Sequence, residues 1–326
     1  MSQEQTLIEV QDLRKWFAVR KGILSLLGPQ KYVHAVDGVN FNIKKGEVLC
    51  LVGESGSGKT TTARLVLRLE TPTWGHIFYD GIDLATVDRK TMREMRKQLQ
   101  MVFQNPYDSL DPRMTIYDIL CEPLKINKIC DACDLPGRVV KALDDVGLSP
   151  PEEFIKRYPH ELSGGQRQRI SIARSLVLSP EFIVADEPAS MLDANTRIEI
   201  LNLLADLQEL YGMSILFITH DIAQARYLGN RIAILYLGKI VEIGDTEQII
   251  KSPQHPYTRA LISNIPVPDP EAIRERIDIE GEIPNAINLP VGCRFNPRCP
   301  FAFDKCFKEE PELSMKNGRL SACWLE

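Results

Sequence analysis

The chain has 326 residues, of which 44% are apolar and 25% charged, and this globular balance excludes an intrinsically disordered chain. Its 39 lysines and arginines against 44 aspartates and glutamates give a net charge of −5, so a nucleic-acid partner is not expected. No apolar run approaches the roughly 18 residues that span a bilayer, and residues 1–5 contain no basic region leading into an apolar one, so we expect a cytoplasmic protein.

Short apolar runs alternate with amphipathic stretches from about residue 7 to residue 250. This alternation predicts an α/β unit built on a mainly parallel sheet. Strands buried on both faces are predicted at residues 48–52, 182–185 and 215–218, because these runs are continuously apolar. 

Three further segments have a different pattern. Residues from about 105 to 179 have helical periodicity and are interpreted as an inserted helical subdomain. A hairpin is expected at residues 231–244, with its turn near Gly238 and Lys239. Beyond Ser252 the prolines become dense, which disfavours long helices and sheet strands. We therefore divide the chain into a domain of residues 1–250 and a C-terminal extension of residues 251–326.

A glycine-rich loop after the first predicted strand fits the phosphate-binding pattern G-x-x-x-x-G-K-[ST]. Its glycines let backbone N–H groups turn toward a phosphate, and the helix expected at residues 60–69 adds its dipole. Lys59 is expected to reach the β and γ phosphates of ATP, and Thr60 to place its hydroxyl on Mg²⁺. The predicted nucleotide-binding residues here are Gly53, Glu54, Ser55, Gly56, Ser57, Gly58, Lys59, Thr60 and Thr61.

Two adjacent carboxylates, Asp186 and Glu187, end the predicted strand at residues 182–185. Burying such a pair is costly unless a cation or a proton shares the site. We expect Asp186 to hold Mg²⁺ through water, and Glu187 to act as general base on the attacking water.

A Leu-Ser-Gly-Gly-Gln run precedes an amphipathic helix expected at residues 167–178. Ser163 and Gln166 have the spacing of a capping box, so a plain helix start is one interpretation. Gly164 and Gly165 cost helix stability but leave the terminal N–H groups uncovered for an anion, which favours a second phosphate contact.

These three motifs together resemble the nucleotide-binding subunit of an ABC transporter, over roughly residues 7–250. The resemblance implies a P-loop core with antiparallel β and helical subdomains. It also implies that Gln104 senses Mg²⁺ and the attacking water, and that His220 contacts the γ phosphate. Residues 190–193 match the loop that joins two such subunits.

The aromatic residue that stacks on adenine should fall near an inserted segment at residues 15–31. Tyr32 is the first candidate and Phe17 the second. The resemblance further implies that two subunits stack head to tail. Each ATP then lies between the phosphate loop of one subunit and the Ser-Gly-Gly-Gln run of the other.

Four cysteines of the C-terminal extension offer thiolate ligands in a segment too short to build much of a core: Cys293, Cys299, Cys306 and Cys323. Their spacing leaves zinc and an iron–sulfur cluster equally open, with free thiols as the third alternative. Cys130 and Cys133 lie in an expected loop before Leu135 and Pro136, and we expect no metal or redox role for them.

The run Pro-Gln-His-Pro-Tyr-Thr-Arg-Ala-Leu at residues 253–261, followed by the cysteines, resembles the dipeptide/oligopeptide importer ATPases. The resemblance implies a four-iron four-sulfur cluster on the four cysteines. It also implies a heterodimer with a sister ATPase, two membrane permeases, a substrate-binding protein, and a peripheral position at the cytoplasmic face of the membrane. A permease is expected to press on residues 105–113.

We therefore expect an ATPase that powers peptide import. Oligosaccharides and nickel are alternative cargoes. A DNA-associated ATPase is the second alternative, but such proteins usually carry long coiled coils between these motifs. Here the intervening segment is about a hundred residues without sustained heptads. 

Overall fold

The computed structural model describes residues 5–19, 30–129, 131, 134–264, 277 and 279–325. Most of the insertion expected at residues 15–31, as well as Cys130 and Cys133, lies outside the described residues. The chain forms two compact units. We call the unit of Lys44–Glu47 and Thr86–Phe217 the helical unit, and that of Thr6–Ile43, Val48–Ala85 and Ile218–Glu326 the loop unit. Among the described residues, no helix has the length and apolar character needed to cross a lipid bilayer.

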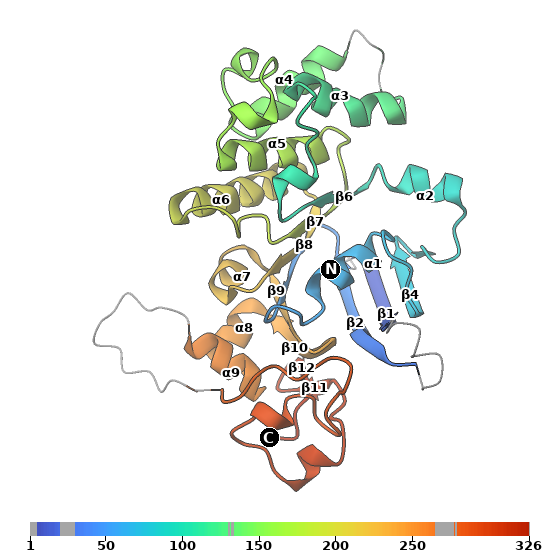
Figure 1. Cartoon of the computed structure of the whole chain (residues 1–326), viewed down its shortest axis with the longest axis vertical. Helices are drawn as coiled ribbons and strands as arrows, with labels where there is room; N and C mark the ends of the chain where they lie inside the picture. Colours follow the sequence, from blue (N-terminus) through green and yellow to red (C-terminus); the bar gives the residue numbers. More distant parts are fainter. Residues whose placement is uncertain are drawn as a thin grey trace. The chain divides into compact units, whose positions relative to one another are not determined.

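The helical unit contains α2 (Arg89–Met95), β6 (Leu99–Val102), α3 (Ile116–Asn127), α4 (Leu135–Asp145), α5 (Gly164–Leu176), β7 (Phe182–Asp186), α6 (Ala194–Tyr211) and, as far as Phe217, β8 (Ser214–Thr219). α4 packs against α3 and α5, and α5 packs against α6 (Figure 1). The described part of the segment 105–179 holds helices and no strand, as its periodicity predicts, whereas its status as a separate subdomain stays a prediction.

Local sequence explains why these helices form where they do. The α4 face predicted from periodicity is buried at Val139, Leu143 and Val146, whereas Val140 is only half-buried. α3 begins at Thr115, whose side chain accepts a hydrogen bond from the Asp118 N–H.

The three strands of the helical unit lie in the order β8-β7-β6, with β6 parallel to β7. Every residue of β7 is buried. The predicted strands at 182–185 and 215–218 are thus confirmed, and β7 carries Asp186 at its carboxyl end.

The loop unit contains two sheets. The strands of the first sheet lie in the order β2 (Tyr32–Lys44), β1 (Thr6–Ala18), β4 (Trp74–Tyr79) and β5 (Ile82–Asp83). Within this sheet, β1 pairs with β4 in antiparallel orientation. In the second, β3 (Val48–Val52) runs parallel to β9 (Arg231–Tyr236). β9 forms the predicted hairpin with β10 (Lys239–Asp245), and its turn holds Leu237 and Gly238 at φ angles of 43° and 76°.

The helices of the loop unit are α1 (Lys59–Val66), α7 (Ile222–Leu228), α8 (Thr246–Lys251) and α9 (Pro256–Ser263). α1 is shorter than the helix expected at residues 60–69. It ends at Val66, and Arg68 adopts a left-handed φ of 49°, a conformation that no helix continues.

The C-terminal extension is not free of strands. β11 (Ser314–Lys316) pairs with β12 (Arg319–Ser321), and β12 pairs with β10 through Glu242 and Ser321. Both strands fall in a stretch without proline, where every residue can donate to a ladder. The domain boundary at residue 250 stays a prediction.

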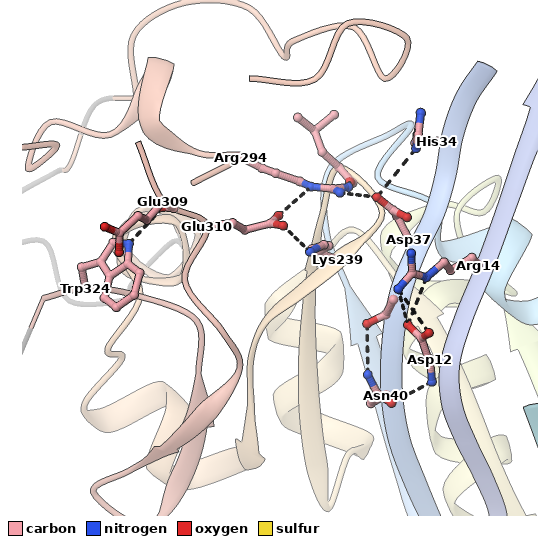
Figure 2. Close-up of polar contacts among 12 residues, drawn as sticks. Asp12, Arg14, His34, Asp37, Asn40, Lys239, Arg294, Glu309, Glu310 and Trp324 are labelled. Atoms are coloured by element: carbon pink, nitrogen blue, oxygen red, sulfur yellow. Dashed lines mark hydrogen bonds and ion pairs between the residues drawn. The ribbon is translucent and has the colours of Figure 1, made fainter. Parts of the chain in front are cut away.

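A buried arginine ties the extension to the first sheet. Arg294 is 7% exposed and pairs with Asp37 of β2 and, at 3.1 Å, with Glu310 (Figure 2). Glu310 also accepts from Lys239 of β10 at 2.6 Å. Burial raises the pKa of the Asp37 carboxyl, but the hydrogen bond and charge of Arg294, the hydrogen bond from Trp16 and the charge of His34 together leave this pKa below its ordinary value.

We expect Arg294→Met to lower the free energy of unfolding by about 3–5 kcal/mol, because it leaves Asp37 buried without its cation. The measurement is chemical denaturation at neutral pH. The lowered pKa of Asp37 means that its contribution is present above the unfolded-state pKa and is lost as pH falls through the folded-state pKa. The difference between wild type and Asp37→Asn should therefore shrink in acid below about pH 4.

Lys251→Met is the control, since the exposed Lys251 pairs with the exposed Glu247 at 3.2 Å and its loss should cost at most about 1 kcal/mol. An Arg294→Met protein as stable as this control would contradict the structural role of the Arg294 pair.

Candidate functional site

The glycine loop of residues 53–58 joins β3 to α1 and leaves no room for side chains at two positions. A Cβ on Gly53 would lie 2.2 Å from the Leu235 carbonyl oxygen. Gly58 has φ +108°, and a Cβ there would lie 2.1 Å from the Ala35 carbonyl oxygen. Both glycines are therefore required by close backbone approach.

Lys59 folds back over this loop rather than out to solvent. It is 5% exposed, and its Nζ donates to the carbonyl oxygens of Gly53 at 2.7 Å and Glu54 at 3.1 Å. The Ser57 hydroxyl is buried and has no hydrogen-bond partner within the described structure. Buried polar atoms are rarely left unpaired, so this orphaned hydroxyl fits a loop that receives a polar ligand such as a phosphate. Thr60 and Thr61 lie half-buried in the first turn of α1.

Two residues of the C-terminal extension contact the same loop. The Glu54 N–H donates to the Tyr257 hydroxyl at 3.0 Å. The Glu54 carboxylate accepts from Arg298 through Nη1 at 2.8 Å and Nη2 at 3.2 Å. Neither contact was predicted from the sequence. Tyr257 was visible only as part of a family motif, and nothing in the sequence singles out Arg298.

In the helical unit, the structure brings together Glu187, Gln104 and Ser190. The Gln104 Nε2 lies 3.4 Å from the Glu187 Oε2 and 3.4 Å from the Ser190 hydroxyl oxygen. Glu187 follows the buried Asp186 and adopts a left-handed φ of 45°, an uncommon conformation for a residue other than glycine. Strained residues of this kind cluster at active sites.

The start of α5 has the predicted capping box. The Ser163 side chain accepts from the Gln166 N–H at 3.2 Å, and the Gln166 side chain accepts from the Ser163 N–H at 3.0 Å. Ser163 and Gly164 are exposed. Gly165 has a packing reason that the sequence did not reveal, since a Cβ there would lie 2.5 Å from the Thr196 Cγ2 of α6.

The remaining predicted residues belong to the loop unit. His220 follows β8 and is exposed. The two candidates for stacking on adenine, Tyr32 and Phe17, are each 39% exposed. The Trp16 ring lies 6.4 Å from the Tyr32 ring and 4.6 Å from the His34 ring. The choice of the adenine-stacking residue stays a prediction.

The four cysteines of the extension carry free thiols. Burial and the charges of the other three thiols raise the pKa of the Cys293 thiol to about 11, against a hydrogen bond from the Phe295 backbone that lowers it. The thiols thus lie within electrostatic range of one another. Even so, within the described ranges no three Cys, His, Asp or Glu side chains are arranged to hold a metal ion. The geometry therefore does not support the expected cluster directly.

Comparisons with known proteins match both parts of the sequence. Residues 36–190 match the family described as ABC transporter, and residues 241–306 match the oligopeptide/dipeptide transporter C-terminal region. The dipeptide transport ATP-binding protein DppF of Haemophilus influenzae is 46% identical, over 98% of this chain and 96% of its own length. DppF of Escherichia coli (strain K12) is 43% identical, over 98% of this chain and 95% of its own length.

A solved ATP-binding cassette, a dimer in a post-hydrolysis state with ADP and phosphate bound, is similar at a TM-score of 0.63 and 31% identity. The likeness covers 74% of this chain and 99% of that one, and it confirms the expected P-loop ATPase fold. The relatives match at 43–46% identity over 98% of this chain, and the chain belongs to the ATP-binding cassette ATPases of ABC transporters.

Proposed function

We propose that this chain hydrolyses ATP to power the import of dipeptides or oligopeptides, at the cytoplasmic face of a membrane. The carrying observation is the match to dipeptide transport ATP-binding proteins over 98% of the chain, together with the transporter C-terminal region at residues 241–306. No comparable observation favours oligosaccharides, nickel or DNA.

Nucleotide binding is assigned to the glycine loop. Lys59 exchanges its two carbonyl contacts for the β and γ phosphates of ATP, and the unpaired Ser57 hydroxyl gains a partner. Thr60 and Asp186 would hold the Mg²⁺ that accompanies ATP, and this ion would supply charge neutralisation at the phosphates. His220 contacts the γ phosphate. 

Hydrolysis is assigned to Glu187. Its carboxylate takes a proton from the water that attacks the γ phosphorus. Gln104 orients this carboxylate through the 3.4 Å contact and contributes to sensing Mg²⁺ and the water. The Ser190 hydroxyl donates to the Glu187 carbonyl oxygen at 3.0 Å, which supports the left-handed backbone of Glu187.

A sister ATPase is the proposed partner of α5. The exposed Ser163 and Gly164 stand at a helix N-terminus, where uncovered N–H groups favour an anion. Support comes from the dimeric state of the solved cassette. A heterodimer places this helix end against the ATP held by the partner's loop.

Two permeases and a substrate-binding protein complete the proposed assembly. The expected permease contact at residues 105–113 displays Tyr107, which is 61% exposed. The Arg167 guanidinium lies 4.4 Å from the Tyr107 ring centroid, and Arg167 belongs to α5. A permease that moves Tyr107 therefore acts on the helix that carries Ser163.

We also propose that the four thiols of the extension hold a four-iron four-sulfur cluster, with zinc as the alternative. Their mutual proximity supports this, as does the Leu325 N–H, which donates to the Cys323 sulfur at 3.4 Å as donors do around metal-bound thiolates. Binding requires the thiols to rearrange, since within the described residues no three of them are placed to hold a metal ion. The metal centre supplies cross-links between four points of a proline-rich segment.

Glu187→Gln should retain ATP binding and lose at least about 100-fold in turnover, because the amide cannot accept the proton. We would measure ATPase activity and labelled dipeptide uptake in vesicles with the permeases, the sister ATPase and the binding protein. The ATPase activity of the wild-type assembly should rise when dipeptide is added and should not change when DNA is added.

Glu181→Gln, at the opposite end of β7, is the matched control and should keep wild-type turnover. Normal turnover in Glu187→Gln would remove it as the base. Stimulation by DNA alone would overturn the transport function.

Lys59→Ala should weaken ATP binding by at least about tenfold, since it removes a charge-assisted contact to the phosphates. Titration calorimetry without turnover measures this affinity. Lys251→Ala removes an exposed lysine of the same unit and should bind like wild type. An unchanged affinity in Lys59→Ala would refute the assignment of the loop.

Protein purified without oxygen should be brown and contain about four iron atoms per chain. Cys323→Ser should lose the colour and most of the iron, whereas Cys50→Ala, a substitution at a buried cysteine outside the extension, should keep both. One zinc per chain, or no bound metal, would refute the iron–sulfur assignment.

A further inference from the structure

We propose that two residues of the C-terminal extension, Arg298 and Tyr257, position the glycine loop for ATP by holding Glu54. The extension thereby becomes part of the nucleotide-binding apparatus. The inference needs only the ATP binding shown by the family and does not depend on the transported substrate.

Glu54 is held at its side chain, its N–H and its carbonyl group. Its carboxylate accepts hydrogen bonds from both terminal nitrogens of Arg298, and its N–H donates a hydrogen bond to the Tyr257 hydroxyl oxygen. Its carbonyl oxygen accepts from the Lys59 Nζ at 3.1 Å. The two residues of the extension thus fix Glu54, one of the two residues whose carbonyl oxygens hold Lys59 before ATP binds.

The extension presents these two groups from a rigid base. The rings of Tyr236, Tyr257 and Phe295 are at most 1% exposed, and their centroids lie 4.8–5.4 Å apart. Arg298 also donates to the Tyr236 hydroxyl at 3.4 Å. Packed aromatic side chains have few alternative rotamers, so the Tyr257 hydroxyl and the Arg298 guanidinium are preorganised for Glu54.

Charge gives Arg298 a second effect on the loop. Glu54 places a carboxylate in a loop that binds a polyanion, and its side chain is 26% exposed. Arg298, at 8% exposed, neutralises this carboxylate through a two-pronged contact. Without Arg298, the unpaired negative charge opposes the phosphates of ATP, and the Glu54 backbone loses one of its anchors.

Two variants test the hold on Glu54. Arg298→Ala should lower ATP affinity about tenfold, as expected when a charged group loses its hydrogen-bond partner. Tyr257→Phe removes one hydroxyl, leaves the ring packing intact and should lower affinity about fivefold. Affinity is measured by calorimetry with MgATP, alongside the melting temperature without nucleotide.

A double-mutant cycle shows whether Arg298 acts through Glu54. Arg298→Ala should lower ATP affinity about tenfold when Glu54 is present and less than about twofold in a Glu54→Ala background. Equal costs in both backgrounds would overturn the proposal, as would an Arg298→Ala protein with wild-type affinity. Arg298→Lys keeps the charge but not the two-pronged geometry, and it should recover part of the lost affinity.

Arg319→Ala is the matched control for a general effect of loosening the extension. Arg319 is a buried arginine of the same extension, and it contacts Glu242, Gln248 and Ser252, which lie outside the loop. It should lower the melting temperature and leave ATP affinity unchanged. A loss of affinity in Arg319→Ala equal to that in Arg298→Ala would mean that only folding of the extension matters and would overturn the proposal.

Discussion

The close packing of three backbone segments around the glycine loop is the constraint on which the site depends. The Gly238 N–H donates to the Ser57 carbonyl oxygen at 2.8 Å, and the Gly238 carbonyl oxygen accepts from the Asp37 N–H at 2.9 Å. The loop, the β9–β10 turn and β2 are therefore joined in series. Because Gly58 approaches the Ala35 carbonyl oxygen so closely, a side chain at Gly58 would separate these segments and spoil the phosphate cradle.

At Glu187 a residue with a side chain adopts a backbone conformation that glycine favours. Its left-handed φ costs free energy, which the surrounding contacts must offset. Ser190 holds the Glu187 carbonyl oxygen, while Gln104 reaches the carboxylate from the end of β6. The fully buried strand β7 thus leads into a strained residue at its carboxyl end, and stability elsewhere in β7 tolerates the strain.

The sequence predicted features that depend on local order along the chain. The glycine loop, the buried strands β3, β7 and β8, and the Ser163 capping box follow from spacing and apolar runs. Contacts between distant residues were not predictable in this way. Arg298 and Glu54 are 244 positions apart, and Gly165 is required by Thr196 of another helix. The early end of α1 was missed because Arg68 gives no glycine-like signal for its positive φ.

One short segment of the extension, residues 293–299, carries two arginines that reach the rest of the loop unit. Arg294 contacts Asp37 and the Leu237 carbonyl oxygen beside the Gly238 turn, and Arg298 contacts Glu54 in the loop itself. Cys293 and Cys299 each directly adjoin one of these arginines in sequence. A metal centre on the thiols would therefore order both arginines at once, and with them the turn and the loop that they hold. This arrangement explains why an ATPase would carry a cysteine-bearing segment that has little core of its own. The segment acts on the nucleotide loop through two arginines, and the Tyr257 hydroxyl of the same extension acts with them.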